Sequence, residues 1–106
     1  MFKKILIPVD DSSCSRQAGE YGLELAKRFG SSVVVTHVLE ELPRIYSGTD
    51  WAEALLEQGN VLLGIWKKKG SEAGVTLETI ISASQNFAGS IIHTANENAC
   101  DLIVMG

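Results

Sequence analysis

Short continuous apolar runs alternate along the chain with longer stretches whose apolar residues recur every three or four positions. The first run, Lys4–Val9, contains Ile5, Leu6 and Ile7 in succession and does not alternate with polar residues. A continuous run of this kind is typical of a strand that helices cover on both faces. Three further runs share this character and predict three more strands: Ser32–Leu39, Val75–Ile81 and Leu102–Met105.

Three segments between these runs have the spacing of helices. Ser13–Phe29 carries an apolar stripe and is followed by Gly30, which suits a left-handed helix cap. A second helix is predicted to begin at Asp50, and a third to follow the capping residue Asn86 and to end near Asn98. The residues expected to face the core are Ala18, Gly22, Leu25 and Phe29 in the first helix, Trp51, Leu55, Gly59, Leu62 and Trp66 in the second, and Phe87, Ile91, Ile92 and Ala95 in the third. The small residue Gly59 is expected to let the second helix lie close to the sheet.

The element order βαβαβαβ predicts an α/β fold with an open, doubly wound parallel sheet of about four strands, in a single domain that spans residues 1–106. The segment Glu40–Thr49 keeps no period and is expected to be a loop over the carboxyl edge of the sheet. Ligands of such sheets bind outside the carboxyl ends of the strands, so Asp10 and Gly106 are candidate site residues. A charge at a buried strand end is costly, which favours a function for Asp10.

The charge pattern and the length of the apolar runs exclude two classes of partner. The formal net charge is −4, and the basic residues are scattered apart from the run Lys67–Lys69, which is expected on a solvated helix face. This pattern lacks the electrostatic footprint of a protein that binds nucleic acid. No apolar run approaches the length of a membrane-spanning helix. We therefore expect neither nucleic acid nor a membrane as a partner.

The cysteines and histidines do not suggest a metal or a nucleophile. Cys14 and Cys100 are two lone cysteines in a chain without a signal peptide, which favours reduced thiols in a cytoplasmic protein. His37, near the end of the second strand, is expected to be satisfied by hydrogen bonds, and His93 to face solvent. Neither histidine has a second ligand at metal-binding spacing, so no zinc site is predicted.

Several motifs, spread from the first strand to the last residue, resemble the universal stress protein family. They are Ile5-Leu6-Ile7-Pro8-Val9-Asp10 with Ser12, Leu25-Ala26 before Gly30, Val35-Thr36-His37-Val38, Ala73-Gly74-Val75 and Ala99–Gly106. The resemblance implies a Rossmann-like fold of the adenine nucleotide α-hydrolase type, with the strands in the order 3-2-1-4. It also implies that the chain binds an adenine nucleotide, ATP with or without Mg²⁺, and that it forms a homo-oligomer or binds another protein.

The resemblance assigns nucleotide-binding roles to six residues. Pro8 and Val9 match the wall on the first strand, and Asp10 matches the carboxylate at the adenine and ribose end. Val38 matches the apolar residue against the base. Met105 and Gly106 match the start of the phosphate-side motif. A carboxylate can accept hydrogen bonds from ribose hydroxyls or an exocyclic amine. It cannot hold phosphate, which needs the backbone amides of a glycine-rich loop at a helix N-terminus.

In the family, such a loop, a further helix and a fifth strand follow the Met-Gly pair, and many members form dimers through that strand. The sequence ends at Gly106, so we expect a truncated domain without these elements and with weakened nucleotide binding. The strand 102–105 is then expected to be a bare sheet edge or to be covered by another chain. Asp11, Gln85 and Phe87 depart from the residues usual in the family, and Asp11 would repel phosphate unless a cation such as Mg²⁺ intervened.

Two functions are compatible with these observations. The first is a regulatory domain of the stress response that binds an adenine nucleotide, and the second is a stress protein that acts by association with other proteins. An enzymatic role beyond at most weak ATP hydrolysis is not expected, because no acid, base and nucleophile converge. A receiver domain is excluded, because the strand Val75–Ile81 is not followed by the aspartate that such a domain phosphorylates. Asp10–Arg16 contains no glycine and therefore no dinucleotide-binding loop.

Overall fold

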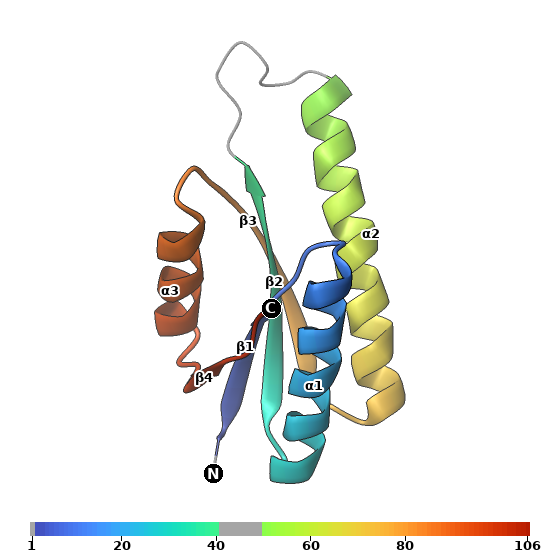
Figure 1. Cartoon of the computed structure of the whole chain (residues 1–106), viewed down its shortest axis with the longest axis vertical. Coiled ribbons are helices and arrows are strands. Elements are labelled where there is room, and N and C mark those ends of the chain that lie inside the picture. Colours follow the sequence, from blue (N-terminus) through green and yellow to red (C-terminus); the bar gives the residue numbers. More distant parts are fainter. Residues whose placement is uncertain (1, 41–49) are drawn as a thin grey trace.

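The computed structural model describes residues 2–40 and 50–106, and the predicted loop at 41–49 lies outside the described residues. The elements are β1 (Lys4–Pro8), α1 (Ser13–Phe29), β2 (Ser32–Glu40), α2 (Asp50–Ala73), β3 (Leu77–Ser84), α3 (Phe87–Glu97) and β4 (Leu102–Ile103). All strand pairs are parallel, and the sheet has the order β3-β2-β1-β4 (Figure 1). The predicted fold class and strand order are confirmed.

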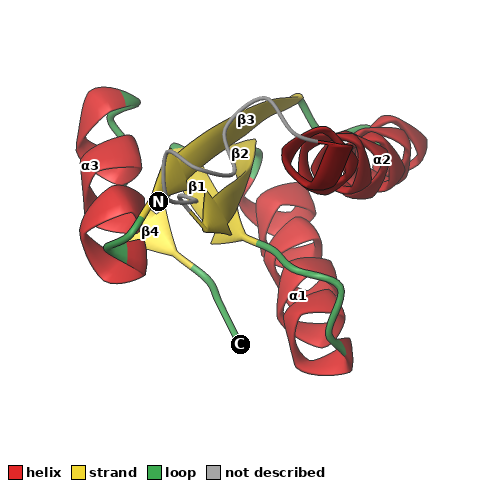
Figure 2. Ribbon diagram, turned by 90° about the horizontal axis from the view of Figure 1, so that it is seen from above, coloured by secondary structure: helices red, strands yellow, loops and turns green. Residues whose placement is uncertain are grey.

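Helices cover both faces of the sheet: α1 and α2 lie on one face and α3 on the other (Figure 2). The central strand β1 is therefore the most enclosed, and its residues Ile5, Leu6 and Ile7 have no exposed surface. Ile5 and Ile7 belong to the cluster that Trp66 and other residues of α1 and α2 complete, whereas Leu6 packs with Ile91 of α3. Both faces of this strand thus require apolar side chains, which explains the continuous run in the sequence.

The helix ends follow the predicted capping residues. At the start of α1, Ser12 Oγ accepts a hydrogen bond from Ser15 N at 3.1 Å. Gly30 ends this helix in the left-handed conformation, with a φ of 66°. At the start of α3, Asn86 Oδ1 accepts a hydrogen bond from Gly89 N at 3.0 Å. Local sequence therefore determines these boundaries, as expected from capping preferences.

The third and fourth strands differ from their predicted ranges. β3 begins two residues later than predicted and extends through Ser82–Ser84, because its ladder with β2 continues as far as the pair Glu40–Ser84. β4 contains only Leu102 and Ile103, which pair with Ile5 and Leu6 of β1. The length of the neighbouring strand β2, and not the local apolar run, determines where β3 ends, whereas β4 ends although β1 continues to Pro8.

The inward faces of the helices agree with the prediction only in part. Gly59 and Trp66 of α2 are buried as predicted, whereas Trp51 is 64% exposed. In Figure 1 the start of α2 projects beyond the end of β2, so the first turn of this helix has no strand to cover. The prediction was also wrong for three exposed residues of the other helices: Phe29, Phe87 and Ile92.

Asp101, directly before β4, connects this end of the chain to the first strand. Its two carboxylate oxygens accept hydrogen bonds from Lys3 N at 3.0 Å and from Lys4 N at 3.2 Å. These bonds stabilise the charged form and hold the pKa of Asp101 below its ordinary range. The start of β1 is therefore fixed by a side chain as well as by the sheet ladder.

We expect Asp101→Asn to lower stability near neutral pH, because the amide keeps one acceptor oxygen and loses the charge. Since the folded-state pKa of Asp101 is lowered, its stabilising contribution is complete above the unfolded pKa of about 4 and disappears as the pH falls through the folded value. Urea unfolding of both proteins at about pH 7 and about pH 3 measures this, and the difference in unfolding free energy should narrow at the lower pH. A difference that stays constant would show that the charge contributes nothing.

Candidate functional site

The turn between β1 and α1 presents Asp10 at the carboxyl edge of the sheet. Asp10 Oδ1 accepts a hydrogen bond from Ser12 N at 2.8 Å, and Asp10 N donates to Ser15 Oγ at 2.8 Å. Ser12 Oγ in turn accepts from Ser15 N. The side chain of an aspartate thus closes a short turn on its own backbone, a conformation that aspartate favours. These three bonds fix the Asp10 backbone to the first turn of α1.

His37 of β2 holds the same turn from the other side. Its Nδ1 lies 2.8 Å from the backbone oxygen of Val9, so Nδ1 carries the proton and donates it. A Cβ at Gly59 of α2 would lie only 3.0 Å from His37 Cδ2, which shows how closely the helix approaches. His37 is therefore satisfied by a hydrogen bond and by packing, as predicted. It positions the residue that precedes Asp10.

The Asp10 side chain is exposed, so the expectation that it lies at a buried strand end is wrong. The reason is that β1 ends at Pro8 and the chain has left the sheet by residue 10. Hydrogen bonding to Ser12 is the main cause that holds the pKa of Asp10 below its ordinary range, and nearby His37 contributes less. Asp10 is consequently a carboxylate at neutral pH and can accept hydrogen bonds from a ligand.

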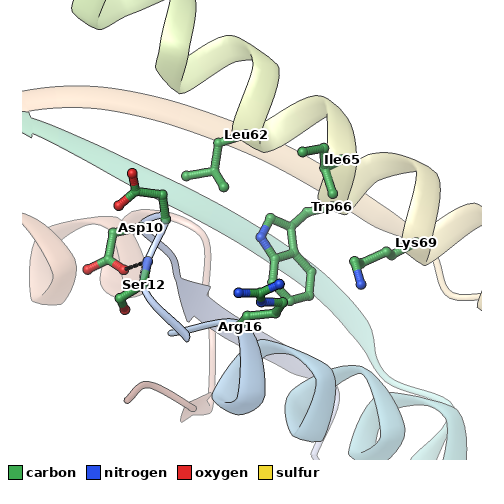
Figure 3. Close-up of a pocket in the computed structure, with 8 residues that line it drawn as sticks. Asp10, Ser12, Arg16, Leu62, Ile65, Trp66 and Lys69 are labelled. Atoms are coloured by element: carbon green, nitrogen blue, oxygen red, sulfur yellow. Dashed lines mark hydrogen bonds between the residues drawn. The ribbon is translucent and has the colours of Figure 1, made fainter. Parts of the chain in front are cut away.

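Asp10 borders a hollow of about 290 Å³ between α1 and α2, which we call the α1–α2 hollow. Figure 3 shows its three contributing segments: residues 10–12 of the turn, Arg16 of α1, and a row on α2. The row on α2 consists of Leu62, Ile65, Trp66 and Lys69. The sequence analysis did not place Arg16 or the residues of α2 beside Asp10, because no motif connects these separate elements.

Lys69 was expected on a solvated helix face, and it is half-buried. Its Nζ lies 2.8 Å from Glu20 Oε1 of α1 and 5.4 Å from the centroid of the Trp66 ring. The ion pair therefore joins α1 and α2 at one end of the hollow, and the cation–π contact, between two residues of α2, holds the lysine against the indole. The other two residues of the predicted run, Lys67 and Lys68, are exposed as expected.

The other predicted site residues lie around the carboxyl edge but outside this hollow. Pro8 and Val9 are buried at the end of the central strand. Val38 lies two residues beyond Thr36, the register partner of Pro8, and is half-buried against the cluster under α3. The side chain of Met105 is 47% exposed, and a Cβ on Gly106 would lie 2.6 Å from the backbone oxygen of Cys14.

Gly106 therefore lies against the first turn of α1, and Figure 2 shows that end of the chain away from α2. Cys14 and Ala18, which Gly106 contacts, lie on the opposite face of α1 from Arg16. The turn that carries Asp10 thus has the end of the chain at Gly106 on one side and the α1–α2 hollow on the other.

A parallel sheet of this order, with a tethered polar turn at the end of its central strand, defines an open α/β domain with a crevice at its topological switch point. More narrowly, the chain belongs to the universal stress protein family, because the sequence model described as "Universal stress protein family" matches residues 1–106. The resemblance noted in the sequence is thereby confirmed.

Individual relatives agree with this assignment. A universal stress protein of Methanocaldococcus jannaschii is 32% identical over 111 residues, an alignment that covers 100% of this chain. The chain spans 65% of the length of that curated relative.

Solved structures show the same fold. A family protein from Burkholderia pseudomallei matches with a TM-score of 0.85 and 23% identity, over 95% of this chain and 78% of its own. A family protein from Arabidopsis thaliana, solved with AMP bound, matches with a TM-score of 0.73 and 21% identity, over 96% of this chain and 76% of its own.

Two kinds of feature are absent from the described residues. No three histidine, cysteine, aspartate or glutamate side chains in the ranges 2–40 and 50–106 are grouped so that they could hold a metal ion. None of the helices in those ranges combines the length and hydropathy of a membrane-crossing helix.

Proposed function

We propose that the chain is a regulatory domain of the stress response that binds an adenine nucleotide at the carboxyl edge of its sheet. The observation that carries this proposal is the ionised carboxylate of Asp10, which accepts from Ser12 N in a turn that two further hydrogen bonds tie to the start of α1. A carboxylate at this place suits the hydroxyls of a ribose. The AMP in the Arabidopsis thaliana relative supports this class of ligand.

In this proposal each predicted residue has a role that follows from its place. Asp10 accepts hydrogen bonds from the ribose, while Pro8 and Val9 form the wall below it. Val38 supplies an apolar contact for the base, and the backbone around Met105 and Gly106 lies on the phosphate side. ATP with Mg²⁺ is the expected ligand form, because a cation offsets the repulsion between Asp11 and phosphate.

The proposed role is binding and not catalysis, with at most slow hydrolysis of ATP, in the cytoplasm. A second candidate function is association with another protein or a second copy of the chain. The observation that favours it is the edge strand β4, which pairs with β1 alone among the described strands and has Ile103 38% exposed. Strand edges and exposed apolar side chains are features that partners recognise.

Calorimetric titration of the protein with ATP and Mg²⁺ separates the two functions. Saturable heat with one nucleotide per chain would support nucleotide binding. Absence of heat at every concentration tested, together with a concentration-dependent mass in analytical ultracentrifugation, would refute it and leave association as the function.

Asp10→Asn is expected to weaken nucleotide binding about tenfold, because hydrogen bonds to a charged acceptor are worth about 1.5–3 kcal/mol and the amide removes the charge. The amide oxygen can still accept from Ser12 N, so the turn should persist. Asp11→Asn is the matched control, since it removes the same charge one residue away and should not weaken binding. Equal losses in the two variants, measured by the same titration, would show that only overall charge matters.

A further inference from the structure

We propose that the outer face of α2 is a docking surface for a second copy of this chain, with the two α2 helices packed antiparallel about a two-fold axis. This surface is separate from the crevice at Asp10 and from the edge strand β4, and its use does not depend on nucleotide binding. Figure 2 shows α2 at the margin of the molecule, with α1 and the sheet on its inner side. The outer side of this helix is therefore open to a partner.

Exposed residues of α2 form a row with the spacing of a coiled coil, which we call the outer seam. They recur at alternating steps of three and four: Trp51, Ala54, Gln58, Val61, Ile65 and Lys68. Trp51, Val61 and Ile65 are 64%, 60% and 50% exposed. The outer face of a surface helix is ordinarily polar, whereas apolar residues at this spacing are the pattern through which helices pair.

The outer seam contains a depression of the kind that receives a side chain from a facing helix. Its volume is about 350 Å³, and four residues line it at the relative positions i, i+3, i+4 and i+7: Ala54, Glu57, Gln58 and Val61. In paired helices an apolar side chain enters such a space between four residues of the partner. If the two-fold axis passes close to Val61, Ile65 lies four positions after the axis and faces Glu57 of the second copy, four positions before it. Ile65 of each copy then enters the depression of the other.

The charges beside the outer seam are complementary when the two helices run in opposite directions. Glu53 and Glu57 lie on the N-terminal half of the helix and Lys67 and Lys68 on its C-terminal half, all of them exposed. Within residues 2–40 and 50–106, none of these four side chains forms an ion pair within 4.0 Å. About the axis at Val61, Lys68 of one copy lies within one helical turn of both glutamates of the other. A parallel copy would instead place like charges together.

The contact is small, so we expect a weak dimer. The outer seam runs about 21 Å from Trp51 to Ile65, at 1.5 Å per residue, and two helices that touch over this length bury less than the roughly 1,200 Å² of a stable complex. Asp50 and Glu72 of the two copies face each other at the ends of the contact, where solvent screens their repulsion. We therefore expect a monomer at about 1 µM and a dimer near about 1 mM.

Sedimentation equilibrium of the full chain between about 1 µM and about 1 mM tests the interface, with Val61→Lys as the variant. The mass of the parent protein should rise from that of one chain toward that of two. Val61→Lys places two like charges at the axis and should weaken association by about a hundredfold, which leaves a monomer. Ile92→Lys is the matched control and should dimerise like the parent, since Ile92 is 57% exposed on a different helix, α3.

Exchanging charges tests the antiparallel direction. Glu57→Lys and Lys68→Glu, made singly, should each weaken the dimer about tenfold, because each puts like charges together twice across the two-fold axis. The double variant should recover the affinity of the parent, because opposite charges meet again. In a parallel pair the single changes would replace one set of like charges by another and would not weaken association.

The outcomes are decisive for this surface. A mass that stays that of one chain at every concentration refutes it, and so does a dimer that persists in Val61→Lys. Equal losses in Val61→Lys and Ile92→Lys would show an effect of added surface charge and refute it as well. A double charge variant no better than the single ones refutes the antiparallel arrangement. All variants should unfold in urea like the parent at about 1 µM, where the monomer predominates, because the substituted residues are exposed. None of these results alters nucleotide binding, which calorimetric titration tests separately.

Discussion

Trp66→Ala is expected to lower the free energy of unfolding by about 3–5 kcal/mol, the usual cost of truncating a large buried aromatic side chain. Trp66 is only 2% exposed, belongs to the main core cluster and forms the base of the packing between α1 and α2. A domain of this size is stable by roughly 5–15 kcal/mol, so the variant would be marginally folded. Urea unfolding followed by far-UV circular dichroism measures the loss.

Trp51→Ala is the matched control for this prediction, because the same truncation is made in the same helix at a side chain that is 64% exposed. Its effect should stay within about 0.5 kcal/mol, as for most surface substitutions. Similar losses in the two variants would contradict the orientation of α2 that places Trp66 inward and Trp51 outward.

Gly19→Ala is expected to destabilise the protein by about 1–3 kcal/mol, although alanine is the better helix former. A Cβ at Gly19 would lie 2.3 Å from Trp66 Cη2 and 2.7 Å from its Cζ2. The indole is rigid and buried, so α1 and α2 would have to separate to relieve the overlap. The midpoint of thermal or urea unfolding reports the change.

Gly64→Ala should have the opposite sign and stabilise the protein by about 0.5–1 kcal/mol. Gly64 is an exposed residue of α2, and a Cβ there would meet no atom within 4 Å. Comparing the glycine-to-alanine change at Gly64 and at Gly19 thus separates the effect of helix propensity from that of steric overlap. A stabilised Gly19→Ala variant would mean that the two helices are less closely packed than their contact at Trp66 indicates.

Much of the fold could be predicted because its determinants are local. Continuous apolar runs indicated the central strands, and Gly30 and Asn86 marked helix ends through capping that involves neighbouring residues only. The range of β3 could not be predicted in this way, since Ser82–Ser84 join the sheet through pairing with β2. The orientation of Trp51 likewise depends on how far α2 extends past the sheet.

The candidate site also has a part that could be predicted from local sequence and a part that could not. Asp10 was predicted because it directly follows the first strand, and the turn bonds that hold it involve residues close in sequence. Arg16 meets Trp66 and Lys69 only through the packing of α1 on α2, which itself depends on the absence of a side chain at Gly19. The contact of Lys69 with Trp66 is local, three residues apart on one helix, whereas its ion pair with Glu20 of α1 has no local signal in the sequence.

The strands of the sheet are paired over unequal lengths, with eight paired positions between β2 and β3 and two between β1 and β4. Opening β4 breaks few ladder bonds, whereas separating β3 from β2 disrupts most of one side of the core. Excursions from the native state should therefore begin at the C-terminal strand and leave the β1–β2–β3 unit intact. The Asp10 turn, anchored by His37 of β2 and Ser15 of α1, belongs to that persistent unit and would survive such partial unfolding.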